Sequence, residues 1–250
     1  MADVLTGAEP FSAAGGGDGV LVLHGFTGSP QSMRGLAEAF AAAGFTVELP
    51  RLPGHGTTLE DMATTSWADW SGAAEAAYGE LAGRCRRVVV AGLSMGGTLT
   101  LWLAACHPEI AGIVLVNALA DATPLADARA AAQGALENGM QFLPGIGSDI
   151  ADPSVQELAY DGVPSACLVS LIDATEELAP RLREIRVPAL VFHALQDHVV
   201  ARGSRELLES SLAGPVEVVE LERSYHVATL DHDRDEIERR SVEFARRVLA

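Results

Sequence analysis

The stretch Val88-Val89-Val90-Ala91-Gly92-Leu93-Ser94-Met95-Gly96 decides the fold. Its first six residues form an unbroken apolar run, which is typical of a strand buried on both faces of a sheet. Residues 98–106 then follow a helical pattern. The flanking glycines leave room for a sharp turn that presents the hydroxyl of Ser94 at the carboxyl edge of the sheet, where a base can activate it. The stretch therefore predicts a nucleophilic serine, although a plain turn would also fit the pentapeptide alone.

The segments on either side alternate between strand-like and helix-like patterns. Strands are expected at residues 20–23, 46–49, 113–116, 189–192 and 216–221, and helices at about 31–43, 67–81 and 235–249. Continuous apolar strands separated by helices are typical of a parallel sheet that is covered on both faces. The pattern predicts an α/β fold with a mostly parallel, doubly wound sheet.

This alternation is interrupted at about residues 120–185. The interval has several helical pieces, a Pro- and Gly-containing loop at 143–148 and no good buried strand. We expect it to be a helical cap insertion near the strand ends, within one domain that spans residues 19–250. Residues 1–18 end in a glycine-rich run and are expected to be a flexible N-terminal lead-in.

Two further polar residues follow strands in the order that a serine nucleophile requires. Asp197 comes just after the strand that begins at residue 189, and His226 lies in the loop after the last strand. Both would lie at the same sheet edge as Ser94, because the carboxyl ends of parallel strands share an edge. We expect Ser94 to be the nucleophile, His226 the general base and then acid, and Asp197 the carboxylate that orients the imidazole. Taken singly, a turn-forming aspartate and a loop histidine are the simpler interpretations.

Other histidines offer alternatives. His232, between Asp231 and Asp233, is a rival base, but it falls where the last helix begins, which favours a solvated helix cap. An Asp-His-Asp metal site is a further alternative, and the prediction is that no metal is bound. His55, in a glycine-rich turn, and His107, at a helix end before a proline, are interpreted as structural.

An acyl-transfer site also needs donors for the oxyanion. We expect them to be the backbone N–H of Met95, directly after the nucleophile, and the backbone N–H of Phe26 in the loop after the first core strand. The alternative is that His24 and Gly25 only form a tight turn.

Composition limits the class of protein. The chain has 250 residues, of which 48% are hydrophobic and 20% charged, and this composition is typical of a globular domain. The net charge of −17 opposes binding to nucleic acid. All 17 basic residues are arginine, and the absence of lysine excludes Schiff-base chemistry and a Walker-type phosphate lysine.

The N-terminal sequence and the cysteines indicate the cellular compartment. No basic region precedes an apolar stretch at the N-terminus, and no window is apolar enough for a membrane span, so we expect a cytoplasmic protein. Cys85, Cys106 and Cys167 have no metal-type spacing and are expected to be buried thiols in a reducing environment.

Five motifs together resemble one known family. They are HGFTG at 24–28, LPGHGT at 52–57, GLSMGGT at 92–98, QDHVV at 196–200 and SYHVATLD at 224–231. The chain, from residue 23 to the last helix, resembles the bacterial monoacylglycerol lipases, relatives of small bacterial carboxylesterases in the α/β-hydrolase superfamily. The resemblance implies the α/β-hydrolase fold and places the catalytic and oxyanion residues at the positions given above.

The resemblance extends into the cap insertion. The strings IGSD at 146–149 and ELAY at 157–160 are similar to the cap of that family, although the Ala-rich stretch 128–135 departs from its pattern. By resemblance, Ile146 would line an acyl tunnel and Glu157 would bind the glycerol hydroxyls, since a carboxylate accepts hydrogen bonds from a diol. The alternatives are an apolar cap contact for Ile146 and a solvated helix position for Glu157.

These observations predict a serine hydrolase that cleaves monoacylglycerols, or similar medium-chain esters, to fatty acid and glycerol through an acyl-serine intermediate. No metal or organic cofactor is expected, and the partner is a small lipid ester. The apolar cap is expected to touch a membrane or micelle surface transiently, which would make the protein peripheral at the membrane. A general carboxylesterase or thioesterase, and a ligand receptor without hydrolytic activity, are the alternative functions.

Overall fold

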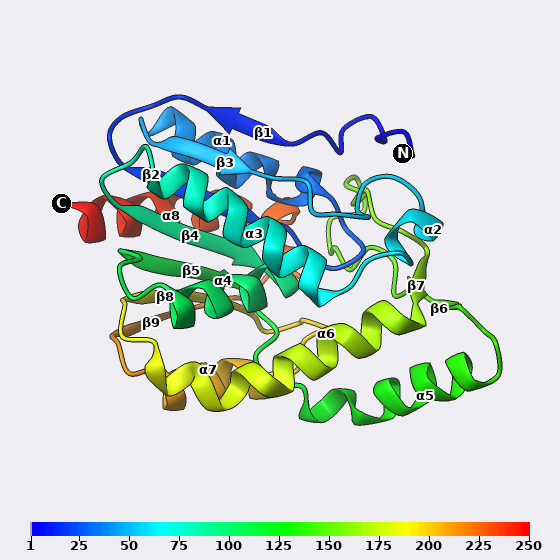
Figure 1. Ribbon diagram of the computed structural model, residues 1–250. Helices are drawn as coiled ribbons and strands as arrows, with labels where there is room; N and C mark the ends of the chain where they lie inside the picture. Colours follow the sequence, from blue (N-terminus) through cyan, green and yellow to red (C-terminus); the bar gives the residue numbers. More distant parts are fainter. Residues whose placement is uncertain (1) are drawn as a thin grey trace.

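Seven strands form one central sheet in the computed structural model, which describes residues 2–250 (Figure 1). The sheet order is β1 (Phe11–Ala13), β3 (Thr46–Leu49), β2 (Gly19–Leu23), β4 (Val88–Leu93), β5 (Gly112–Val116), β8 (Ala189–Ala194) and β9 (Val216–Leu221). Every neighbouring pair is parallel except β1 and β3, which are antiparallel. The predicted α/β fold with a mostly parallel sheet is confirmed.

The alternation of side chains along each strand explains how the helices cover the sheet. Leu21 and Leu23 of β2 belong to the core beneath α3 (Trp67–Ala82), α4 (Met95–Cys106) and α7 (Gly203–Ser211). Val20 and Val22 belong to the core beneath α1 (Arg34–Ala42) and α8 (Arg234–Leu249). Because both faces are covered, successive residues of β2 are all fully buried.

The carboxyl ends of the central strands meet at one edge. Leu23 of β2 pairs with Gly92 of β4, and Leu93 of β4 pairs with Val116 of β5, so these strands end at nearly the same level. After β2 the chain turns outward to β3, whereas β4 and β5 continue on the opposite side of β2. The loops that follow β2 and β4 therefore diverge, which is where α/β sheets leave a crevice for ligands.

The residues between β5 and β8 form a separate layer at this edge (Figure 1). They comprise the 3-10 helix η2 (Thr123–Leu125), α5 (Ala126–Glu137), β6 (Phe142–Pro144), β7 (Gly162–Pro164), α6 (Ser165–Leu178) and the 3-10 helix η3 (Ala179–Glu184). Helices α5 and α6 pack alongside each other, and β6 and β7 pair in an antiparallel hairpin. The hairpin was not predicted, because strands of three partly exposed residues leave no periodic pattern.

Shorter elements complete the chain. They are the 3-10 helices η1 (Pro30–Met33) and η4 (Ala228–Leu230) and the one-turn helix α2 (Leu59–Met62). Helix α2 begins at Thr58, whose hydroxyl accepts from the backbone N–H of Asp61 at 3.1 Å. That cap, rather than an apolar repeat, defines so short a helix.

The expectation of a flexible lead-in is wrong for part of residues 1–18. Phe11 pairs with Leu49 across β1 and β3, and the hydroxyl of Ser12 donates to Glu48 at 2.6 Å. Without β1, strand β3 would leave one edge of backbone groups unpaired. A three-residue strand at the sheet edge therefore replaces part of the expected lead-in.

The cysteines only partly follow the prediction. Cys167 is buried, and its thiol donates to the carbonyls of Met62 and Thr65 at 3.2 Å each. Cys106, however, is exposed, because it is the last residue of α4 and lies beyond the layer that covers the sheet. All three cysteines are free thiols. Within residues 2–250, no helix combines the length and the apolar character needed to cross a membrane.

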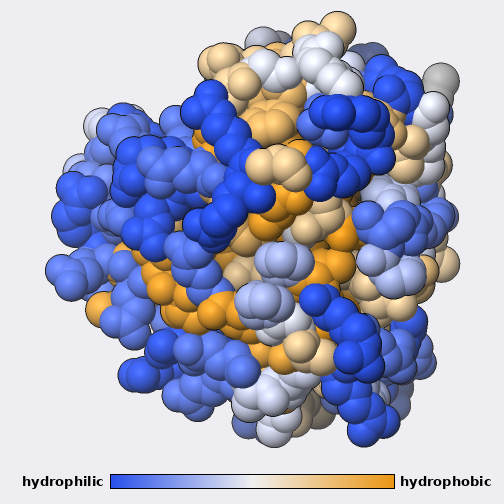
Figure 2. Space-filling model, turned by 90° about the vertical axis from the view of Figure 1, so that its left-hand side faces the viewer, coloured by the Kyte–Doolittle hydropathy of each residue, from blue (hydrophilic) through white to orange (hydrophobic). Residues whose placement is uncertain are grey.

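The amino-terminal edge of the sheet carries an apolar hollow. A cavity of about 430 Å³ lies there, lined mainly by apolar residues such as Pro188, Val216 and Phe244 and bordered by Glu217 and Arg247. Figure 2 views the side of the molecule where the C-terminus lies and shows apolar residues gathered between hydrophilic ones. This hollow lies at the opposite end of the strands from the crevice.

Close backbone contacts explain the glycines of the turn after β4. A Cβ atom added at Gly96 would overlap the backbone of Leu23 at the end of β2, and one added at Gly92 would overlap Gly96 itself. Ser94 between them has φ 55° and ψ −118°, a strained conformation for a residue other than glycine. The sharp turn thus exists only because the first turn of α4 can approach β2 this closely.

We expect Gly96→Ala to destabilise the protein by about 1–3 kcal/mol, since the added methyl meets backbone that cannot move without distorting β2. Gly79→Ala is the matched control, because Gly79 lies within α3 and an added Cβ there meets nothing within 4 Å. The control should raise the free energy of unfolding by about 0.5–1 kcal/mol. Denaturant unfolding of both variants measures this, and equal stability of the Gly96→Ala variant and the wild type would contradict the steric argument.

Candidate active site

Ser94 is the first residue after β4 and immediately precedes α4. Its backbone N–H donates to the carbonyl of Val116 at the end of β5 at 3.0 Å, which fixes the turn to the neighbouring strand. The loop after β2 lies directly against it, since a Cβ added at Gly25 would be 3.5 Å from the Cβ of Ser94. The serine thus lies between the ends of β2 and β5, at the crevice.

His226 and Asp197 form a buried pair. The Nδ1 atom of His226 lies 2.9 Å from Oδ2 of Asp197, and their side chains are 9% and 1% exposed. The other carboxylate oxygen accepts from the backbone N–H groups of Val199 and Val200 at 2.8 and 2.9 Å. Burial alone would raise the pKa of Asp197, but the hydrogen bond and charge of His226 and these two N–H groups lower it below its usual value. Asp197 is therefore an anion that holds the imidazole.

Ser94 and His226 line the same cavity. Among residues 2–250, no hydrogen bond joins the hydroxyl of Ser94 to the ring of His226, whose Nδ1 is bonded to Asp197. Catalytic hydrogen bonds are often long or absent without substrate and form in the substrate complex. The three predicted residues thus lie at one edge of the sheet, and His226 and Asp197 are already hydrogen-bonded to each other.

The backbone N–H groups of Phe26 and Met95 donate to no other atom within residues 2–250. Met95 is the first residue of α4, so its N–H is one of the groups left without a helical acceptor. Both are free to donate to a ligand oxygen.

His24 fixes the direction of the Phe26 N–H. Its Nε2 accepts from the backbone N–H of Leu52 at 3.1 Å, so the proton is on Nδ1, which donates to the carbonyl of Gly25 at 3.0 Å. In a trans peptide the next N–H points the opposite way from that carbonyl, so the N–H of Phe26 points away from His24. Burial, and next the nearby His55, lower the pKa of His24 to about 3, which keeps this ring neutral.

The cavity at this edge has a volume of about 450 Å³ and is largely apolar. Core and cap together supply its apolar lining, which includes Leu119, Leu125, Leu143, Leu168, Leu171 and Val200. Its polar groups are few, among them Ser94, His226, Asp149 and Glu157. Such a cavity suits an apolar chain attached to a polar reacting group.

The two residues taken from the family resemblance also reach this cavity. Ile146 lines it and is 69% exposed, so it lies at the opening. Glu157 lies against the loop after β2, because a Cβ added at Gly28 would be 2.7 Å from its Oε1. Burial raises the pKa of Glu157 to about 7, although the charge of His226 opposes the shift. Glu157 belongs to residues 145–161, which contain no helix or strand, so the alternative of a solvated helix position is wrong.

Sequence reasoning missed two residues that contact the loop carrying His226. Asn117 directly follows β5, accepts from the N–H of Ala194 at 2.8 Å and donates to the carbonyl of His226 at 2.7 Å. Asp149 accepts from the backbone N–H of His226 at 3.0 Å and lies 2.8 Å from Nδ1 of His198. A polar residue at the end of a buried strand was the available signal for Asn117, whereas the signal for Asp149 was its place in the IGSD string at 146–149, which says nothing of its contact with His226.

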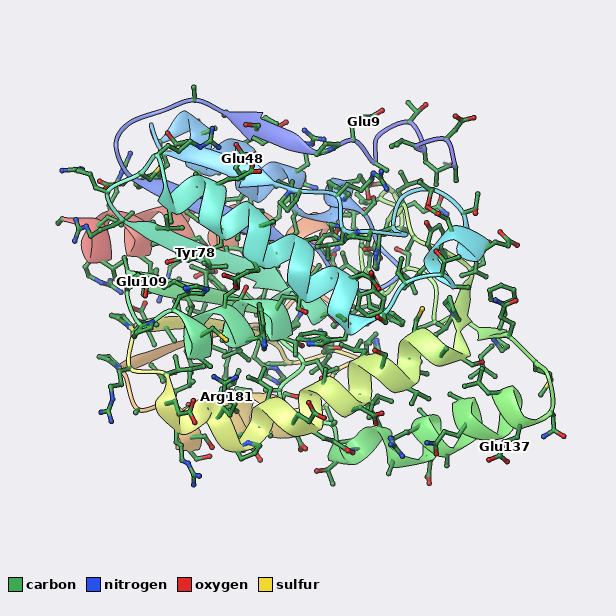
Figure 3. All side chains as sticks on the ribbon, viewed as in Figure 1. Glu9, Glu48, Tyr78, Glu109, Glu137 and Arg181 are labelled. Carbon is green, nitrogen blue, oxygen red and sulfur yellow. The ribbon has the colours of Figure 1, made fainter. Side chains whose placement is uncertain are left out.

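The two histidines interpreted as structural, His55 and His107, are held by aromatic packing and by hydrogen bonds. His55 is fully buried, and its ring lies 5.1 Å from that of His24 and 5.6 Å from that of Trp70, measured between centroids. His107 directly follows α4, and its Nε2 lies 2.8 Å from Oε1 of Glu75. Its ring lies 4.5 Å from that of Tyr78, measured between centroids, and the hydroxyl of Tyr78 donates to Glu109 at 3.2 Å; Figure 3 labels both Tyr78 and Glu109.

His232 and its flanking aspartates do not form a second site. Asp231 is fully buried and accepts from the backbone N–H groups of Ala151 and Tyr225 at 2.7 and 2.9 Å. Asp233 accepts from the hydroxyl of Ser224 at 2.9 Å and directly precedes α8. The described part of the chain holds no cluster of histidine, cysteine, aspartate and glutamate suited to a metal ion. Both aspartates are instead hydrogen-bond acceptors for the backbone and side chains around them.

A parallel sheet that presents a serine on a strand–helix turn, followed by an acid and a histidine after later strands, defines the class of nucleophile-elbow hydrolases. The sequence profile of the alpha/beta hydrolase family matches residues 20–240. The chain therefore belongs to the alpha/beta hydrolase family, as the motifs predicted.

Individual relatives agree with this assignment. The chain is 49% identical over 242 residues to a thermostable monoacylglycerol lipase of Bacillus sp. (strain H-257), covering 96% of this chain and 95% of that protein. It is 28% identical to a carboxylesterase of Bacillus subtilis (strain 168), covering 94% and 95% of the two chains. A solved structure described with the metagenome-derived lipolytic enzymes LipS and LipT has a TM-score of 0.93 at 44% identity, covering 98% of this chain and 100% of that one.

Proposed function

We propose that this protein is a serine ester hydrolase that cleaves monoacylglycerols to fatty acid and glycerol. The observation that carries the proposal is the buried Asp197–His226 pair at the wall of the apolar cavity that Ser94 also lines. The 49% identity to a monoacylglycerol lipase over nearly the whole chain supports the substrate class.

The geometry supports a two-step reaction. The hydroxyl oxygen of Ser94 attacks the ester carbonyl while Nε2 of His226 takes its proton, and Asp197 stabilises the imidazolium through Nδ1. The intermediate collapses, the bond to the glycerol oxygen breaks, and His226 returns the proton to that oxygen. Water then attacks the acyl-serine with the same base, which releases the fatty acid and restores Ser94.

The two free backbone N–H groups would bind the oxyanion of each tetrahedral intermediate. Phe26 supplies one from the loop after β2, and Met95 supplies the other from the start of α4. Because His24 bonds to the preceding carbonyl, the first donor is oriented before substrate binds. Preorganised donors of this kind stabilise a transition state more than water does, since they do not have to reorient.

Two residues favour a monoacylglycerol over a simple ester. Ile146 lies at the opening of the apolar cavity, where it would contact the acyl chain. Glu157 presents a carboxyl group to the cavity beside the loop after β2, where it would accept hydrogen bonds from the two free glycerol hydroxyls. An alcohol ester without these hydroxyls would leave Glu157 unpaired.

A general carboxylesterase activity is the second candidate. The carboxylesterase of Bacillus subtilis is 28% identical over almost the full length, and the same serine, histidine and aspartate would serve any ester that fits the cavity. The selectivity between glycerol and simple alcohol esters therefore decides between the two functions.

Contact with a lipid surface is part of the same proposal. Leu136, Met140 and Ile146 are large apolar residues of the cap that are exposed to solvent. We place a transient contact with a micelle or membrane here, since it would bring an apolar substrate to the opening. The net charge of −17 makes a neutral or zwitterionic surface the matching partner.

We expect Ser94→Ala to lower kcat on monoacylglycerols by about 10⁴- to 10⁶-fold, because no other group replaces the nucleophile. A fluorophosphonate should label the wild type and fail to label this variant. The matched control is Ser210→Ala, at an exposed serine of α7, which should keep full turnover and labelling. A folded wild type that turns over no ester and takes no label would refute the hydrolase, and leave a ligand receptor.

Phe26→Pro should lower kcat by about 10²- to 10³-fold, since proline removes one oxyanion donor. That N–H has no acceptor within residues 2–250, so its loss breaks no native hydrogen bond. Phe26→Ala keeps the donor and loses the packing of the ring on Trp70 and His55 and its part of the cavity lining, so it should spare most of kcat. Steady-state turnover of both variants, with thermal unfolding as a check on folding, measures the difference. Equal losses of kcat would argue against the backbone donor.

Glu157→Gln should reduce the ratio of kcat/KM for a glycerol ester to kcat/KM for an ethyl ester of the same acyl chain by about fivefold, since an ionised acceptor binds hydroxyls more strongly. The pKa of Glu157, raised to about 7, makes this ratio larger at pH 8 than at pH 6 in the wild type. The same base serves both esters, so its pH dependence divides out of the ratio. In the Glu157→Gln variant the ratio should therefore be independent of pH.

The control is Glu137→Gln, the same substitution at an exposed position at the end of α5 (Figure 3). It should keep the wild-type ratio at both pH values. A wild type with no preference for glycerol esters would leave the carboxylesterase as the function.

A further inference from the structure

His226 is held at three points by side chains from three different elements. Asp197, after β8, binds ring atom Nδ1 at 2.9 Å, and Asn117, after β5, donates to the backbone carbonyl at 2.7 Å. Asp149, from the cap, accepts from the backbone N–H at 3.0 Å. The ring and both sides of the main chain of this residue are therefore fixed separately.

Both oxygens of the Asp149 carboxylate are used. Oδ1 lies 2.8 Å from Nδ1 of His198, and Oδ2 accepts from the backbone N–H groups of His198 and His226 at 3.3 and 3.0 Å. The backbone carbonyl of Asp149 also accepts from the N–H of Val227 at 3.0 Å. The side chain is only 12% exposed, so these hydrogen bonds to a charged acceptor are little weakened by water.

Asp149 lies in an irregular segment that crosses the crevice. Residues 145–161, which we call the cap strap, contain no helix or strand and include Ile146 and Glu157 of the cavity lining. Toward its far end, the N–H of Tyr160 donates to the carbonyl of Thr27 at 3.1 Å. The cap strap thus joins the loop after β2 to the loop that carries His226.

We propose that Asp149 is a positioning residue for ester hydrolysis: its carboxylate holds the main chain of His226 and so keeps the imidazole within reach of Ser94. This inference rests on the proposed function of Ser94, His226 and Asp197. It also links the cap to the chemistry, because the segment that contacts the substrate cavity at Ile146 also holds the base.

A single hydrogen bond to the ring does not fix the position of a base. With only Nδ1 held by Asp197, the ring can pivot about that bond as the loop shifts, and Nε2 then moves relative to the serine hydroxyl. A displacement of about 1 Å in a reacting group can lower the rate on the order of 100-fold. The hydrogen bond from the backbone N–H of His226 to Asp149 restricts the movement of this loop and therefore the pivoting of the ring.

The test compares two substitutions of Asp149. Asp149→Ala removes both acceptor oxygens and should lower kcat by about 10- to 100-fold with KM changed by less than about threefold. Asp149→Asn keeps one carbonyl oxygen that can accept from the N–H of His226, so it should recover most of the lost kcat. Asp152→Ala is the control, because the carboxylate of Asp152 lies in the same strap and its hydrogen bonds go to Ser154. It should keep the wild-type kcat.

Thermal unfolding and the rate of fluorophosphonate labelling of Ser94 accompany these measurements. The proposal expects the Asp149→Ala variant to remain folded and to be labelled more slowly, in proportion to its kcat. It is overturned if that variant keeps kcat within twofold of the wild type, if only KM changes, if the loss merely follows a loss of folded protein, or if the Asn variant loses as much as the Ala variant. An inactive wild type would instead refute the proposed function, so the two failures are distinct.

Discussion

The approach of the first turn of α4 to the end of β2 is the contact on which the rest of the structure depends. It brings Gly96 against the backbone of Leu23, where any side chain would overlap. The contact forces Ser94 into its strained conformation and places the free N–H of Met95 beside the loop that carries Phe26. The positions of the proposed nucleophile and of the proposed oxyanion donor Met95 therefore follow from one steric constraint, which only glycine satisfies.

The sequence predicted those parts that local patterns encode. Residues 46–49, 88–93 and 216–221 were expected as strands with the bounds that β3, β4 and β9 have, because buried apolar runs next to turn residues are local signals. The Asp197–His226 pair followed from the order of strands at one edge. This prediction was possible because both residues follow strands of a parallel sheet, whose carboxyl ends share one edge.

What the sequence did not predict depends on contacts between distant residues. Strand β1 is defined by its hydrogen bonds to β3, which lies more than 30 residues further along the chain. The β6–β7 hairpin likewise pairs residues that are separated by the whole cap strap. Asp149 accepts from His226, 77 residues further along the chain. No periodicity marks such pairs, since a hydrogen bond to a backbone N–H places no demand on the neighbouring residues. The missed residues are accordingly those that connect the cap to the sheet.

Two carboxyl groups near His226, those of Asp197 and Glu157, have pKa values shifted in opposite directions. Asp197 accepts from two backbone N–H groups as well as from the ring, which lowers its pKa despite its burial. For Glu157 burial is the dominant effect, and its pKa is raised to about 7. The unequal environments of the two carboxyl groups thus leave Asp197 ionised beside the proposed base, and leave Glu157, with a pKa of about 7, at the place where we propose that the substrate hydroxyls bind.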